Sequence, residues 1–179
     1  MPEYVAFLRA INLGKNRKFP MAEVRSVLES AGFGDVETYI QTGNVRLRST
    51  MRSVERVATR LEEVFAADRG FDVPTVVLTP AELREVHADA MAFEPPLEGE
   101  VRRYVTFLRE QADAETAAAV DAIAVEGEAA RVVGRAVHVW VRDGYRSARI
   151  SNGRLERMLG VATTRDLKVV TTLAERWGR

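Results

Sequence analysis

The sequence contains no cysteine, and this absence removes several classes of chemistry. Without thiols there is no disulfide framework, cysteine nucleophile, iron–sulfur cluster or Cys-rich zinc site. Only two histidines, His87 and His138, remain for acid–base chemistry or metal binding. Arg84 and Met91 stand at the helical offsets where a second ligand beside His87 would be needed. His138 lies mid-strand beside Trp140, so the sequence indicates no metal site and no cofactor.

The chain also has no excess of charge of either sign. It has 26 Lys plus Arg and 26 Asp plus Glu among 179 residues. This balance excludes a strongly basic protein held to nucleic acid by bulk electrostatics. The charges are nevertheless segregated, because residues 1–61 and 131–179 are basic and residues 62–130 are acidic. The segregation is compatible with attraction between parts of the chain or with a local basic face.

Long apolar runs are missing as well. No stretch approaches ~18 consecutive apolar residues, the length of a membrane-spanning helix. The N-terminus enters a strand pattern at Tyr4 without a basic segment followed by an apolar one, so no signal peptide is indicated. We therefore expect a cytoplasmic protein without a membrane partner.

Hydrophobic patterning in the first half alternates between strand and helix periods. The 46% apolar content is sufficient for a core. The pattern predicts strand, helix, strand, strand, helix, strand, followed by a short helix. The expected ranges are strands at 4–11, 36–40, 45–47 and 73–78, and helices at 20–31, 54–65 and 80–89. With right-handed crossovers, this order is the split-βαβ or ferredoxin-like arrangement.

The opening strand then recurs in the second half. Residues 104–109 (YVTFLR) match residues 4–9 (YVAFLR) at five of six positions. A helix at 114–124, strands at 130–133 and 136–141 and two short C-terminal helices follow, without a clear final strand. We expect an α+β protein with a duplicated ferredoxin-like fold, a sandwich of antiparallel sheets with helices on one face. The expected division is a first subdomain at 1–92, a linker at 93–100 and a second subdomain at 101–179.

The first unit's topology predicts a polar cluster. Its first two strands would run parallel, so the loop after strand one and the hairpin after strand two should lie at the same end. The loop also leads to Pro20 at a helix N-terminus, which favours anions. The alternative is that these residues only shape turns and meet solvent. The expected ligand-binding residues are Arg9, Asn12, Lys15, Lys18, Gln41, Thr42 and Asn44.

A second polar segment lies between the two predicted C-terminal helices. Thr164 and Arg165 are candidate ligand-binding residues there, with Arg165 as an anion clamp. Helix capping by a threonine or by Asp166 is the alternative explanation. Neither segment has a phosphate-binding glycine motif.

The leading functional hypothesis is a non-catalytic protein that binds a small anionic or nucleotide-like ligand. One alternative is a module that binds RNA or DNA backbone, with Arg46 and Arg48 on one face; the third strand carries no aromatic residues for base stacking. Another is an enzyme acting on a phosphorylated small molecule, with Glu23 or Asp166 as the general base. A protein whose sheets serve only oligomer formation is the remaining possibility.

Four motifs follow one another along the chain: Arg9–Gly14 (RAINLG), Pro20–Arg25 (PMAEVR), Tyr39–Val45 (YIQTGNV) and Ala162–Arg165 (ATTR). Together they resemble the bacterial family known as domain of unknown function 1697. The resemblance implies a bacterial cytosolic protein with two ferredoxin-like subdomains and no established reaction. The family pattern R-G-I-N-V-G is altered here at Ala10 and Leu13, and T-R-N-W is altered at Asp166 and Leu167. If the family's Asn and Trp form a ligand contact, that contact differs in this chain.

Overall fold

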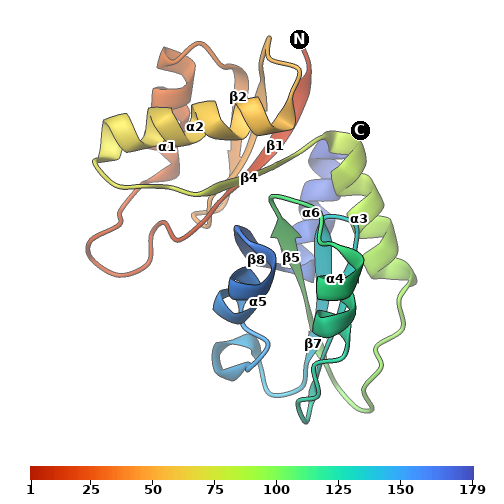
Figure 1. Ribbon diagram of the computed structural model, residues 1–179. Helices are drawn as coiled ribbons and strands as arrows, with labels where there is room; N and C mark the ends of the chain where they lie inside the picture. The colour runs from red at the N-terminus through yellow and green to blue at the C-terminus, as the bar shows by residue number, and fades with distance from the viewer. The chain divides into compact units, whose positions relative to one another are not determined.

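The computed structural model describes residues 1–179 and contains two four-stranded antiparallel sheets (Figure 1). The chain divides into a first unit of residues 1–83 and 175–179 and a second unit of residues 84–174. This differs from the expected division at residues 93–100. The boundary lies within a helix, and the last five residues return to the first unit.

The first unit has the strand order β2-β3-β1-β4. Its strands are β1 (Glu3–Leu8), β2 (Gly34–Tyr39), β3 (Asn44–Arg48) and β4 (Thr75–Leu78), and its helices are α1 (Met21–Ser30) and α2 (Val54–Arg69). β1 is antiparallel to β3 and β4, and β2 is antiparallel to β3, so β1 and β2 run parallel as the topology predicts.

Helices α1 and α2 pack on one face of this sheet (Figure 1). Tyr4, Ala6 and Leu8 of β1 point into the core that these helices form. Val5 and Phe7, on the other face, are also fully buried. Burial of both faces explains why β1 is a continuous apolar run rather than an alternating one.

The second unit repeats this topology with the strand order β6-β7-β5-β8. The equivalence of β1 with β5, both central, agrees with the repeated YV-x-FLR motif. The remaining elements are α3 (Pro80–Ala92), β5 (Arg102–Leu108), α4 (Ala114–Asp121), β6 (Glu128–Val133), β7 (Ala136–Val141), η1 (Tyr145–Ser147), α5 (Asn152–Leu159), β8 (Ala162–Asp166) and α6 (Leu167–Trp177).

β8 corrects the expectation that the second half lacks a final strand. Residues 162–166, expected as a connection between helices, pair with β5 from Ala162↔Leu108 to Asp166↔Tyr104. The second unit is therefore a complete split-βαβ unit. Its core on the α4 and α5 side includes Val120, Val139 and Leu155.

The other face of the second sheet carries His138 and Trp140 of β7. Ala90 of α3 and Leu167 of α6 lie beside it. These two helices are joined by a 3.1 Å hydrogen bond between His87 Nε2 and Thr171 Oγ1. No helix in the structure combines the length and hydropathy needed to cross a membrane.

Candidate functional site

The loop after β1 and the β2–β3 hairpin meet at one end of the first sheet. The Asn12 side chain donates from Nδ2 to the Gln41 carbonyl oxygen at 2.9 Å. Next to this contact, the Leu8 amide donates to the Gly43 carbonyl oxygen at 2.8 Å. The neighbourhood predicted from the parallel course of β1 and β2 is present.

Asn12 holds the loop in shape. Its Nδ2 also donates to the Phe19 carbonyl oxygen at 3.0 Å, and its Oδ1 accepts from the Phe19 amide at 2.8 Å. Asn12 has a left-handed backbone with φ of 55°, which asparagine tolerates better than most residues. Its amide therefore serves the loop, and any ligand contact must come from its neighbours.

Asn44 and Thr42 have the corresponding role in the hairpin. Asn44 is fully buried, and its Nδ2 donates to the Tyr39 carbonyl oxygen at 3.0 Å and to Thr42 Oγ1 at 2.9 Å. These bonds close the turn that presents Gln41. Both residues thus position the site, Asn44 from within the protein and Thr42 from its surface.

A depression of about 310 Å³ lies where the loop, the hairpin and α1 converge. We call it the loop depression; it is lined by Asn12, Gly14, Lys18, Pro20 and Gln41. The α1 N-terminus has no side-chain cap from Pro20. Instead, Gln41 Oε1 accepts a long 3.3 Å hydrogen bond from the Met21 amide, and the Ala22 amide has no acceptor in the protein.

The predicted cations of this site are placed differently from one another. Lys18 lines the loop depression and Lys15 is exposed beyond Gly14, and no carboxylate pairs with either lysine. Arg17, a further cation on the same loop, is committed to the protein, because it donates to the carbonyl oxygens of Ala10 and Asp72. Arg9 is half-buried and does not line the loop depression.

The arginines considered for nucleic-acid backbone are engaged in ion pairs. Arg46 lies 3.6 Å from Glu3 and 3.5 Å from Glu37. Arg48 lies 2.7 Å from Glu3 and 3.0 Å from Asp35. These carboxylates offset the positive charge of β3, so the structure gives no support to a phosphate-binding strand here.

Thr164 is the centre of a hydrogen-bond network in the second unit. Its hydroxyl donates to Asn152 Oδ1 at 2.9 Å and accepts from Tyr145 Oη at 3.0 Å. Thr106 Oγ1 lies 2.7 Å from the same oxygen and supplies a second donor. One donor and two acceptor positions exhaust a hydroxyl, so Thr164 joins β8 to β5, η1 and α5.

Arg165 points to the opposite face of β8 and is 7% exposed. Its Nη1 donates to Thr163 Oγ1 at 2.8 Å and to the Thr164 carbonyl oxygen at 2.9 Å. Burial lowers the pKa of Arg165 to about 10, which leaves it protonated at neutral pH. Asp166 Oδ1 accepts from the Lys168 amide at 2.8 Å, the capping role considered from the sequence.

His138 is 2% exposed, and both of its ring nitrogens lack a hydrogen-bond partner. Burial lowers its pKa to about 4; the nearby Asp89 opposes this shift, and Arg103 and Arg131 add to it. No cluster of three or more His, Asp or Glu side chains is arranged to hold a metal ion.

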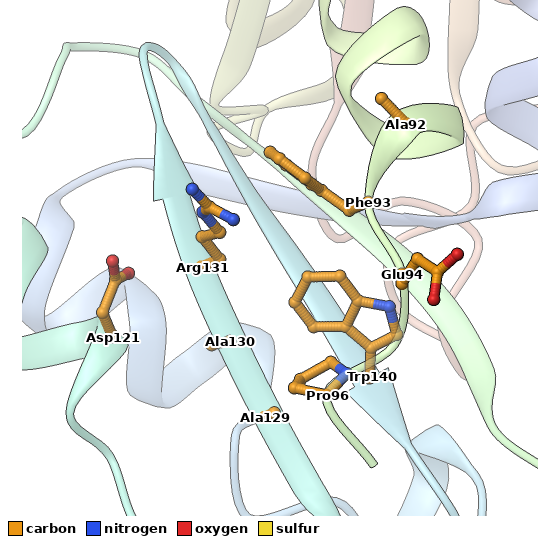
Figure 2. Close-up of a pocket in the computed structure, with 9 residues that line it drawn as sticks. All are labelled: Ala92, Phe93, Glu94, Pro96, Asp121, Ala129, Ala130, Arg131 and Trp140. Atoms are coloured by element: carbon orange, nitrogen blue, oxygen red, sulfur yellow. The ribbon is translucent and has the colours of Figure 1, made fainter. Parts of the chain in front are cut away.

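A larger cavity, which the sequence did not predict, lies in the second unit. It occupies about 620 Å³ between the segment that follows α3 and the outer part of the sheet (Figure 2). Phe93, Arg131 and Trp140 line it. Trp140 beside His138 and an aromatic residue in the expected linker were the available signals, but nothing in the pattern brings residues 93–96 against β6 and β7.

Comparison with known proteins identifies the family of the chain and a solved structure with a similar fold. The structure of a conserved bacterial protein, SP0830 from Streptococcus pneumoniae, superposes with a TM-score of 0.72 at 24% identity, covering 100% of this chain and 99% of that one. No curated protein matches the sequence. The family model for proteins of unknown function DUF1697 matches residues 1–138, so the ATTR motif lies outside the matched range. The chain therefore belongs to the DUF1697 family.

Proposed function

We propose that the protein binds a small anion, such as phosphate or the phosphate of a nucleotide, in the loop depression. The observation that carries this proposal is the position of Lys18, an unpaired cation lining the same depression as the start of α1. The Ala22 amide at that helix start has no acceptor. The partial positive charge of a helix N-terminus and a lysine ammonium both favour an anion between them.

Gln41 supports the proposal because its side chain can change from hydrogen-bond acceptor for the Met21 amide to donor for a bound anion. Its Oε1 holds the Met21 amide through a bond of 3.3 Å, beyond the usual range for an N–H donor. A phosphate oxygen is a stronger acceptor than an amide oxygen. An anion could replace Oε1 at the Met21 amide, and the Gln41 side chain would then be available to donate to it.

The volume and the surrounding groups favour binding of a small group over catalysis. About 310 Å³ is at the lower end for small-molecule pockets, which suits phosphate better than a whole dinucleotide. Both groups considered as general bases have structural partners. Glu23 pairs with Arg69 at 2.5 Å, and Asp166 accepts from Lys168.

A ¹H–¹⁵N NMR titration with inorganic phosphate, and separately with AMP, at constant ionic strength tests the proposal. We expect the Met21 and Ala22 amide resonances to shift saturably. Lys18→Ala should weaken binding about tenfold, because a charge-assisted hydrogen bond is lost.

Lys168→Ala is the matched control, since it removes the same charge from the second unit. It should leave the affinity unchanged. The proposal would fail if neither amide responded to either ligand. It would also fail if the two lysine variants weakened binding equally, because the effect would then be one of net charge alone.

A further inference from the structure

The cavity beside Trp140 has the size and composition of a small-molecule site. Its volume of about 620 Å³ lies in the middle of the range for such pockets. Its walls combine apolar surface from Phe93, Pro96 and Trp140 with the charged groups of Glu94, Asp121 and Arg131. Figure 2 shows the indole of Trp140 in the middle of these residues, with Arg131 and Asp121 on one side and Glu94 on the other.

Trp140 leaves a buried donor unused. The side chain is 3% exposed, and its indole N–H has no acceptor in the protein. A buried tryptophan N–H normally finds a partner, and leaving one unpaired is costly. Its nitrogen lies on the side of Glu94 (Figure 2), where residues 93–100 have no regular secondary structure. Phe93 is anchored, because its amide donates to the Asp89 carbonyl oxygen at 3.0 Å, but the backbone of residues 94–100 makes no such bond. This part of the wall can shift to admit a ligand oxygen.

Arg131 supplies the second recognition group. Its guanidinium lies over the Phe93 ring, 4.4 Å from the centroid, and no carboxylate pairs with it. Stacking holds the guanidinium plane in place and leaves its N–H groups at the edge of that plane available. Those edges match a carboxylate, which can accept two parallel hydrogen bonds.

Two acidic residues also line the cavity, and neither forms an ion pair with Arg131. Asp121 is committed to the fold, because its Oδ1 accepts from the Val132 amide at 2.7 Å. Glu94 is exposed to solvent and lies across Trp140 from Arg131 (Figure 2). Arg131 is thus the charged group that both lines the cavity and is held in position by an aromatic ring.

We propose that this cavity binds a small organic carboxylate with an apolar body. The carboxylate pairs with Arg131, the apolar body packs against Phe93, Pro96 and Trp140, and a ligand oxygen accepts from the indole N–H. The inference is independent of the phosphate proposal, because it concerns the other unit and a different ligand class.

The test uses the full chain and 3-phenylpropionate as the probe. Trp140 and Trp177 are the only tryptophans, so the ¹H–¹⁵N spectrum contains two indole N–H resonances, which a spectrum of Trp177→Phe assigns. We expect the Trp140 resonance to move saturably and the Trp177 resonance to stay in place. Arg131→Met should weaken binding about tenfold or more, and the exposed control Arg157→Met should not.

Phenethylamine has a similar apolar body and the opposite charge, so it distinguishes a carboxylate site from a cation site. Binding of the amine with equal or greater affinity would show a site for cations and overturn the proposal. A Trp140 resonance unaffected by 3-phenylpropionate, or an affinity unchanged in Arg131→Met, would overturn it as well. Arg131 is exposed on an edge strand, so we expect Arg131→Met to fold. A backbone amide spectrum that matches that of the unmodified protein establishes this.

Discussion

Gly43 is the residue on which the meeting of the two polar segments depends most directly. It has a positive φ of 83°, and a Cβ added there would lie 2.8 Å from Leu8 Cβ and 3.2 Å from the Leu8 carbonyl oxygen. Both backbone conformation and space therefore require glycine. This explains why the hairpin can approach β1 closely enough for the Leu8 amide to reach the Gly43 carbonyl oxygen.

Gly43→Ala should lower the free energy of unfolding by about 2–4 kcal/mol, through backbone strain and overlap with Leu8. Urea denaturation measures the loss. Gly14→Ala is the control, because Gly14 has a φ of +71° but no atom within 4 Å of an added Cβ. It should cost only about 1 kcal/mol. Equal losses in the two variants would refute the role given to close packing.

The sequence predicts where individual polar residues lie better than it predicts what their side chains do. The topology placed Asn12 and Gln41 together because the parallel course of two strands determines which loops share an end. It could not show that Asn12 uses its whole amide on Phe19 and Gln41, since that depends on the loop's detailed path. Ala10, where the family pattern has glycine, has a φ of 55°, so the pattern reflects backbone conformation at that position.

Among the strands, β8 is the one that the hydrophobic pattern does not predict. It is short and polar (ATTRD), and helical periodicity flanks it on both sides. Its stability comes from pairing with β5 and from the hydroxyl network of Thr164, neither of which leaves a signal in hydrophobic periodicity. The other strands and helices have clear periods, and most were located within a few residues.

Thr164→Val should destabilise the protein by about 1–3 kcal/mol. Valine has nearly the same shape but leaves Asn152, Tyr145 and Thr106 without their common partner. Thermal and urea unfolding would measure the loss. Thr164→Ser retains the hydroxyl and should recover most of the stability. If valine were tolerated as well as serine, the network would have no energetic importance.

At the scale of the whole molecule, His138 links stability to pH. Its pKa in the folded state is about 4, because burial disfavours the imidazolium, whereas the unfolded chain has the ordinary value of 6.5. Between these values the unfolded state binds the proton and the folded state does not. Stability is therefore complete above about pH 6.5 and falls as the pH decreases toward 4, by about 3 kcal/mol in total.

His138→Leu should remove this part of the pH dependence. The quantity to compare is the difference in unfolding free energy between pH 7 and pH 4.5 in the two proteins, because carboxylates titrating in the same range affect both equally. If His138→Leu loses as much unfolding free energy between pH 7 and pH 4.5 as the unmodified protein does, the assignment to His138 is wrong.

The return of residues 175–179 to the first unit has a consequence for biosynthesis. Trp177 is 3% exposed, and Arg176 pairs with Glu37 and lies 5.2 Å from the Tyr39 ring centroid. These groups leave the ribosome only after all of residues 84–174 have been translated. A nascent chain can therefore assemble the first sheet early, but that unit acquires its last buried side chain only when translation of the second unit is complete.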